Sequence, residues 1–289
     1  MRQRWVSIRE SPRLDFQLPP PLVRRVLPRS IVSPPPRVYK TTAVVLRHRK
    51  LGEADKILTL FTPNYGKLDA VAKGVRRPTS KLAGHVEPLT YSTFLLAKGR
   101  ELDIVTQAEI LEPLTPLRED LERVGRGLYV AELVDRFTPD REESYSLFAL
   151  LLETLRRLAT RDDLELVLRY FEVQLLDELG YRPQLDRCVS CEAALEPTTN
   201  FWSAAGGGVL CPACGAEDPL ARALSLAALK VLRLLQRGSF ADAARVRLDS
   251  ALAQDLERHL LEYIRYVLER DVRSAAFLET LRRQKRTRV

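Results

Sequence analysis

Cysteine and methionine are scarce in this chain of 289 residues, which has four cysteines and a single methionine. It has no apolar stretch long enough to span a bilayer, and its N-terminus lacks the apolar core of a secretory signal. We therefore expect a cytoplasmic protein whose thiols stay reduced. With 45% hydrophobic and 29% charged residues, the composition is that of an ordinary globular protein of about two domains.

Motifs for nucleotide binding and catalysis are also absent. The sequence has no G-x-x-x-x-G-K-[ST] loop, no G-x-G-x-x-G fingerprint, no H-E-x-x-H and no G-x-S-x-G. The three histidines, His48, His85 and His259, are isolated in sequence, and such histidines are more often surface or capping residues than ligands. We expect no nucleotide cofactor and no enzymatic activity. A metal-dependent nuclease built from distant carboxylates is the least favoured alternative.

Charge is distributed unevenly along the chain, which carries a formal net charge of +8. Residues 1–36 have seven arginines against two acids, and residues 37–81 have eleven lysines or arginines against three acids. The last eight residues add five cations, so the segment 82–281 is net acidic. A surface that gathers cations in this way suits the phosphate backbone of a nucleic acid.

Proline is concentrated at the start of the chain. Residues 1–36 hold eight of the 18 prolines, including two Pro-Pro-Pro triplets. Proline cannot donate a hydrogen bond to a sheet, and it disfavours helix at the residue before it. We predict that residues 1–36 form a disordered or polyproline-like arm.

Five stretches after this arm have the β-branched residues and flanking turn residues of strands. They are 39–51, 56–61, 68–72, 88–96 and 101–111. Five short strands this close together suit a small closed barrel, because closure removes the exposed sheet edges. We predict a five-stranded OB-fold barrel over residues 37–113, and an SH3-like barrel is the alternative from pattern alone.

A loop of four cations and no acid, residues 73–81, joins the third and fourth of these strands; we call it the basic loop. Its cations are Lys73, Arg76, Arg77 and Lys81. The first strand adds Lys40, Arg47, Arg49 and Lys50. A charge run alone is usually a solvated loop, but a cluster of this size matches a phosphate footprint. We expect all eight to contact nucleic-acid phosphates, with the basic loop, Arg47, Arg49 and Lys50 acting as one patch.

Two tyrosines of the barrel have two roles open to them. Tyr39 begins the first predicted strand, and Tyr65 lies in the turn before the third. Aromatic rings on such a barrel stack on bases in single-strand-binding proteins. They also fill barrel interiors, and the sequence gives both roles equal weight.

Beyond Pro113 the apolar residues recur with a helical period. Helices are predicted over 117–137, 145–159, 164–179, 225–237 and 251–270. In the third, one face is formed by Leu164, Val167, Leu168, Phe171, Leu175 and Leu179. Arg169 and Glu172 fall elsewhere on this helical wheel. We predict an all-helical domain over residues 114–289 that packs as a bundle and ends in a frayed tail from residue 282.

Two helix starts have capping residues in the sequence. Thr115 before Pro116 is typical of a cap followed by a first-turn proline. Asp140 with Glu143 is typical of a capping box before the second helix. We predict that these residues begin the first two helices.

All four cysteines lie between residues 188 and 214, in two C-x-x-C pairs with 19 residues between them. The ligands would be Cys188, Cys191, Cys211 and Cys214. Two such pairs at this separation match a zinc site. Four thiolates leave no open coordination position, so we predict structural rather than catalytic Zn²⁺. Since residues 188–214 contain no Lys or Arg, we do not expect this module to contact phosphates.

Several stretches resemble the bacterial RecO family of recombination mediators. LGEADKILTLFT at 51–62, YGKL at 65–68 and VAKGVRRPTSKL at 71–82 are similar to its N-terminal domain. DELGYRP at 177–183 and GGVLC at 207–211 are similar to its helix end and zinc element. The resemblance extends over roughly residues 38–280 and leaves out the proline-rich arm.

This resemblance implies an OB-fold followed by a helical domain with an inserted zinc module. It further implies binding of single- and double-stranded DNA and annealing of complementary strands near the nucleoid. The family works with RecR, and in some pathways RecF, to help load RecA onto DNA coated by single-strand-binding protein, and no bound nucleotide is expected. The alternative is a zinc-ribbon transcription factor or RNA-binding protein.

Overall fold

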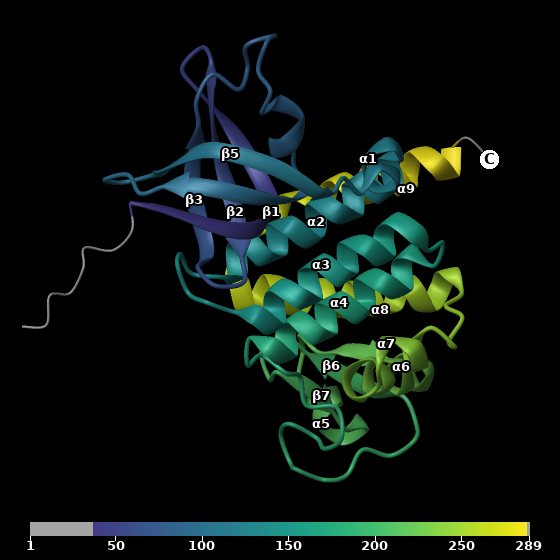
Figure 1. Cartoon of the computed structure of the whole chain (residues 1–289). Coiled ribbons are helices and arrows are strands. Elements are labelled where there is room, and N and C mark those ends of the chain that lie inside the picture. The colour runs from purple at the N-terminus through teal and green to yellow at the C-terminus, as the bar shows by residue number, and fades with distance from the viewer. Residues whose placement is uncertain (1–36, 288–289) are drawn as a thin grey trace, which may run out of the picture. The chain divides into compact units, whose positions relative to one another are not determined.

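The first folded part of the chain is a closed barrel of five strands (Figure 1). The computed structural model describes residues 37–287, so the predicted arm lies outside the described residues. The strands are β1 (Val38–Leu51), β2 (Asp55–Thr62), β3 (Gly66–Ala72), β4 (Tyr91–Ala97) and β5 (Asp103–Glu112). A short 3₁₀ turn, η1 (Ala83–Val86), precedes β4. The prediction of a five-stranded OB-like barrel is confirmed.

The long first strand takes part in both halves of the barrel. Residues 38–44 of β1 pair antiparallel with β4, and residues 44–51 pair antiparallel with β2. The register shifts between Val45 and Arg47, and a bulge at this point bends the strand. A short parallel pairing of β3 with β5 completes the barrel.

The two faces of β1 belong to different cores. Ala43 and Val45 are buried in the core of the barrel itself. Val44 and Leu46 are buried with Phe61 of β2 in the core of the helices that follow. Because side chains alternate along a strand, the outer face of β1 joins the barrel to the helical part by an apolar contact.

Helices make up most of the chain beyond the barrel, as predicted. They are α1 (Thr115–Glu119), α2 (Leu121–Phe137), α3 (Tyr145–Thr160), α4 (Leu164–Glu178), α5 (Pro212–Glu217), α6 (Leu226–Arg237), α7 (Phe240–Ala243), α8 (Ser250–Leu268) and α9 (Arg273–Thr287). α4 is the central helix, because it contacts α2, α3, α6, α7 and α8. None of the helices in the described part of the chain is long and apolar enough to cross a membrane.

The first predicted helix, over 117–137, is wrong as a single element. The chain breaks at Asp120, which has extended backbone angles and accepts hydrogen bonds at its carboxylate from the N–H groups of Glu122 and Arg123. This cap starts a new helix, α2. The predicted Thr115 cap is wrong too, since Leu114 holds the N-cap position of α1 and no side chain caps that helix.

The predicted capping box of Asp140 and Glu143 is wrong. Ser144 caps α3 and accepts a hydrogen bond from the N–H of Leu147. Asp140 instead forms a parallel bridge with Lys67 beside β3. The linker between α2 and α3 therefore contacts the barrel, and α3 begins at Tyr145 as predicted, with Ser144 as its cap.

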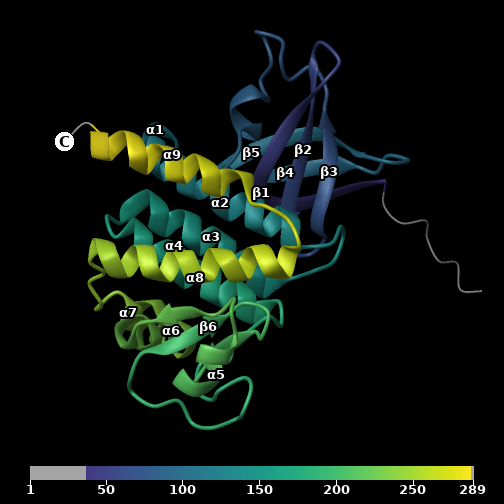
Figure 2. The same cartoon turned by 180° about the vertical axis from the view of Figure 1, so that it is seen from behind.

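The last helix, α9, was missed, and the predicted frayed tail from residue 282 is wrong because this helix continues to Thr287. Val272, Ala275 and Leu278 are buried, and α9 lies along α2 (Figure 2). Its sequence is mostly polar, with few apolar residues to give a helical period. Packing against α2 stabilises this helix. The residues of α9 alone do not indicate that such a packing partner exists.

The linker between α2 and α3 packs tightly on the start of β3 at Gly66. This glycine has φ +59°, and a Cβ at its position would lie 2.0 Å from the Glu142 carbonyl oxygen. We expect Gly66→Ala to lower the free energy of unfolding by more than the about 1–2 kcal/mol that left-handed backbone costs an L-residue. Gly52→Ala is the matched control in denaturant titrations, since Gly52 has φ +55° and no heavy atom within 4 Å of its Cβ position. Equal losses in both variants would contradict a role for the linker contact.

Candidate nucleic-acid interface and metal centre

The basic loop is fastened to the turn between β1 and β2. The backbone N–H of Arg76 donates to the Ala54 carbonyl at 2.9 Å, and the N–H of Gly74 donates to the Asp55 carboxylate at 2.7 Å. The Arg76 guanidinium donates to the Gly52 carbonyl at 3.1 Å. These bonds hold Gly74 and Arg76 of the loop against the turn between β1 and β2.

All four cations of the basic loop are exposed. Val75 in the middle of the loop is buried in the barrel core, which turns the neighbouring side chains outward. No carboxylate of the described residues forms an ion pair with Lys73, Arg76, Arg77 or Lys81. The loop therefore presents uncompensated positive charge to solvent, as a phosphate-binding surface requires.

The cations of β1 differ from one another in their surroundings. Lys50 is exposed and lies two residues before the turn that holds the basic loop. Arg49 is within 3.4 Å of Asp69 on β3. Arg47 pairs with Asp135 of α2, with 2.6 Å between Nε and Oδ2. Arg47 is thus tied to the helical part, and its action with Arg49, Lys50 and the basic loop as one patch stays a prediction.

Lys40 and Lys81 share a separate groove of about 530 Å³ on the barrel. Its other walls include Thr93 of β4 and Thr106 and Gln107 of β5. The groove combines two ammonium groups with hydrogen-bonding side chains. The structure thus divides the eight predicted cations over several places, and their contact with nucleic acid stays a prediction.

Tyr39 is part of the barrel core and is not available for base stacking. Its side chain is buried, and its hydroxyl donates to Asp103. Arg141 from the α2–α3 linker pairs with the same carboxylate at 2.9 Å. Burial, together with the bond to Asp103, raises the pKa of Tyr39. Tyr65, with its ring centroid 4.6 Å from that of Tyr39, is partly buried beside it.

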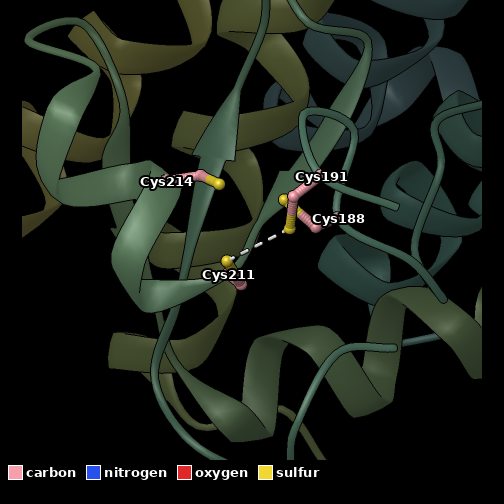
Figure 3. A group of neighbouring side chains, drawn as sticks. All are labelled: Cys188, Cys191, Cys211 and Cys214. Carbon is pink, nitrogen blue, oxygen red and sulfur yellow. Dashed lines mark hydrogen bonds between the residues drawn. The ribbon is translucent and has the colours of Figure 1, made fainter. Parts of the chain in front are cut away.

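The four cysteines come together in a small module between α4 and α6. All four sulfur atoms lie within 4.8 Å of one another (Figure 3). Cys188 and Cys191 come from the loop after α4, and Cys211 and Cys214 lie at the start of α5. The module also contains the sheet of β7 (Gly208–Leu210), β6 (Asn200–Ser203) and β8 (Arg222–Leu224). This donor set is compatible with a metal ion held by four thiolates.

The electrostatics of the thiols also fit a bound cation. Burial opposes ionisation of Cys188, but backbone N–H groups of Cys191 and Cys211 outweigh it and lower the pKa of Cys188 to about 6. At Cys214 a hydrogen bond with Ser190 favours the thiolate, yet the neighbouring thiols raise the pKa of Cys214 to about 12. Four thiolates this close repel one another, and a divalent cation would remove that repulsion.

Trp202 connects this module to the helical part. Its side chain is fully buried, and its ring contacts His259 and Tyr263 of α8 at centroid distances of 5.8 Å each. His259, expected to be a surface or capping residue, is fully buried, and burial lowers the pKa of His259. A lone histidine in a helical sequence gave no indication of this contact, which depends on a strand some 60 residues earlier in the chain.

A buried charge cluster in the helical core was missed by the helical-wheel argument. Arg169 and Glu172 of α4 are 2.8 Å apart and have 1% and 0% of their side chains exposed. The hydroxyl of Tyr129 on α2 donates to Glu172 at 2.7 Å. Burial outweighs the attraction of Arg169 and raises the pKa of Glu172 to about 7. Because α4 is surrounded by other helices, its polar face is buried as well.

The comparison with known proteins agrees over both parts of the chain. The family described as Recombination protein O N terminal matches residues 37–114, and Recombination protein O C terminal matches residues 118–276. The DNA repair protein RecO of Roseiflexus sp. (strain RS-1) is 45% identical over 87% of this chain and 88% of its own length. The RecO proteins of Pelotomaculum thermopropionicum and Dehalococcoides mccartyi (strain BAV1) are 43% and 38% identical over 84% and 86% of this chain and 94% and 97% of their own lengths. The chain therefore belongs to the recombination protein O family of DNA repair proteins.

Proposed function

We propose that this chain is a non-catalytic DNA-binding protein of recombinational repair. It binds single- and double-stranded DNA, anneals complementary strands, and acts with RecR and RecF to help load RecA onto DNA coated by single-strand-binding protein. The observation that carries the proposal is the exposed, unpaired basic loop fixed on an OB-like barrel in a chain of the RecO family. Such a surface binds the DNA backbone without choosing a sequence.

The phosphate contacts in this proposal are the eight cations of the barrel. They are Lys40, Arg47, Arg49, Lys50, Lys73, Arg76, Arg77 and Lys81. The unpaired cations of the basic loop, with Lys50 beside its supporting turn, would make the first contacts. Arg47 and Arg49 already have carboxylate partners, so phosphate must compete with a protein anion at these two positions.

We also propose that Cys188, Cys191, Cys211 and Cys214 hold a structural Zn²⁺. A bound Zn²⁺ would join the loop after α4 to the start of α5. Four thiolate ligands leave no position for a substrate. The module therefore supports the fold, while the barrel meets the DNA.

The double variant Arg76→Ala/Arg77→Ala is expected to weaken binding to all DNA sequences alike. Loss of two phosphate contacts should make the slope of log affinity against log salt shallower by about 1–2. Fluorescence anisotropy with single- and double-stranded oligonucleotides at several salt concentrations measures both effects. The control is Arg222→Ala/Arg258→Ala, which removes two exposed arginines outside the barrel, one on β8 and one on α8. Wild-type affinity at moderate salt in the loop variant would remove the basic loop from the DNA site.

Annealing separates this function from its alternatives. We expect the protein to speed the pairing of complementary oligonucleotides, with and without single-strand-binding protein. An RNA-binding factor would prefer RNA over single-stranded DNA of equal length in competition, because it would use the 2′-hydroxyl. A nuclease would cut the strands when magnesium is added.

Cytoplasmic location and the domain limits 1–36, 37–113 and 114–289 stay predictions.

A further inference from the structure

A groove of about 1090 Å³ lies where β1, α2 and the turn between α8 and α9 come together. Four arginines line it, Arg47, Arg136, Arg270 and Arg273. In Figure 2 the α8–α9 turn lies close to β1, and α9 runs from there along α2. Of these arginines only Arg47 belongs to the barrel contacts proposed above. Three carboxylates, Glu132, Asp135 and Glu269, line the groove as well, so its charged side chains carry an excess of one positive charge.

One carboxylate of the groove, Glu132, is engaged inside the protein. It accepts hydrogen bonds from the backbone N–H groups of Arg273 and Ser274 at 3.1 and 2.7 Å, and so caps the start of α9. It also pairs with Arg136 at 2.7 Å. Burial opposes ionisation, yet the bonds from Ser274 and Arg273 outweigh it and lower the pKa of Glu132. The negative charge of Glu132 is therefore compensated by the N-terminus of α9 and by Arg136.

A second carboxylate of the groove, Asp135, is shared between two cations of the barrel. It lies 2.6 Å from Nε of Arg47 and 3.4 Å from Nζ of Lys67. Only 18% of the Asp135 side chain is exposed, while half of the Arg47 side chain is. Arg47 can therefore meet a second anion from the solvent side, and Asp135 competes with that anion.

The remaining arginines are open to ligands. Arg270 and Arg273 are exposed, and within residues 37–287 no carboxylate forms an ion pair with either side chain. The groove is also lined by the apolar side chains of Leu128 on α2 and Phe277 on α9. Exposed guanidinium groups beside apolar surface suit a sugar–phosphate backbone, since arginine binds phosphate by two parallel hydrogen bonds and also stacks on flat rings.

We propose that this groove is a second site for a nucleic-acid backbone, distinct from the basic loop. Arg270 and Arg273 are its phosphate ligands, Arg47 lies at its barrel edge, and Asp135 restrains Arg47. The inference rests on the proposed DNA binding and extends it. Two backbone sites on one chain would allow it to hold two strands at once, which would bring complementary strands together for annealing.

The test compares Arg270→Ala/Arg273→Ala with the basic-loop double variant. The backbone N–H groups that Glu132 caps remain in this variant, so α9 should keep its start. We expect the annealing rate to fall about tenfold or more, while binding of a short single strand to the basic loop changes by less than about threefold. The salt slope for duplex binding should become shallower by about 1–2. Arg222→Ala/Arg258→Ala again serves as the control.

A second variant, Asp135→Asn, is expected to strengthen DNA binding, whereas damage to the fold would weaken it. Asp135→Asn frees Arg47 from its carboxylate, while Lys67 keeps Asp140 at 3.5 Å, so we expect tighter duplex binding through Arg47 and a steeper salt slope. The inference is overturned if Arg270→Ala/Arg273→Ala anneals and binds like wild type while the basic-loop variant loses binding. It is also overturned if Asp135→Asn leaves affinity unchanged. A wild-type protein that binds no DNA would instead overturn the proposed function itself.

Discussion

Cys211→Ser is expected to abolish metal binding and to lower the melting temperature by about 10 °C or more. The variant keeps three thiols of a set whose sulfur atoms lie within 4.8 Å of one another, and three ligands hold a structural ion far less tightly than four. The small sheet of the module cannot form a core of its own. Its one large buried anchor, Trp202, packs on α8, so disorder in the module should spread to the helical part.

Metal content by emission spectrometry and thermal melting by circular dichroism measure the two effects together. Ala213→Ser is the matched control, because it places the same new hydroxyl in an exposed position of the same turn and leaves the four thiols intact. DNA affinity of Cys211→Ser should stay near that of wild type below its melting temperature, since residues 188–214 carry no cation. Unchanged metal content and melting in Cys211→Ser would show that the cysteines do not hold a structural ion.

The parts of the structure that could be predicted from the sequence are those that depend on neighbouring residues. All five strands were predicted from the β-branched runs and turn residues of residues 37–113, because each strand shows this pattern in its own sequence. The cysteine cluster was predicted from the two C-x-x-C pairs, since four thiols at this spacing in a reducing compartment usually bind a metal ion. The exposure of the basic loop followed from its lack of apolar residues apart from Val75.

The parts that could not be predicted depend on partners far along the chain. Asp135, the partner of Arg47, is 88 residues away, and its carboxylate looks like any other on a helix surface. Glu132 caps a helix that starts 141 residues later. The charge count of residues 37–81 includes Asp69, the partner of Arg49, but it leaves out Asp135, which pairs with Arg47 from a distant helix. Such partners also decide which arginines remain open to DNA.

Arg169→Met is expected to lower the free energy of unfolding by about 3–5 kcal/mol at pH 8. In the wild type, burial raises the pKa of Glu172 to about 7 in spite of Arg169. Because the pKa of Glu172 is higher in the folded state than its ordinary value of 4.5, ionisation of Glu172 favours the unfolded state. The contribution of Glu172 to stability is therefore complete below pH 4.5 and is lost as the pH rises through about 7. Without Arg169 the pKa of Glu172 should rise further, since the nearest positive charge is gone.

The loss in Arg169→Met should therefore depend on pH, and denaturant titrations at pH 5 and pH 8 test this. At pH 5 Glu172 can stay neutral and keep its bond with Tyr129, so we expect a smaller loss than at pH 8. Arg169→Met/Glu172→Gln, which keeps an acceptor for the Tyr129 hydroxyl, should regain most of the stability and show no such difference. Arg182→Met, whose partner Asp177 lies 3.1 Å away at the surface, should cost about 1 kcal/mol or less at either pH. Equal losses at both pH values in Arg169→Met would mean that the packing of the arginine side chain, and not its charge, stabilises the centre of the helical core.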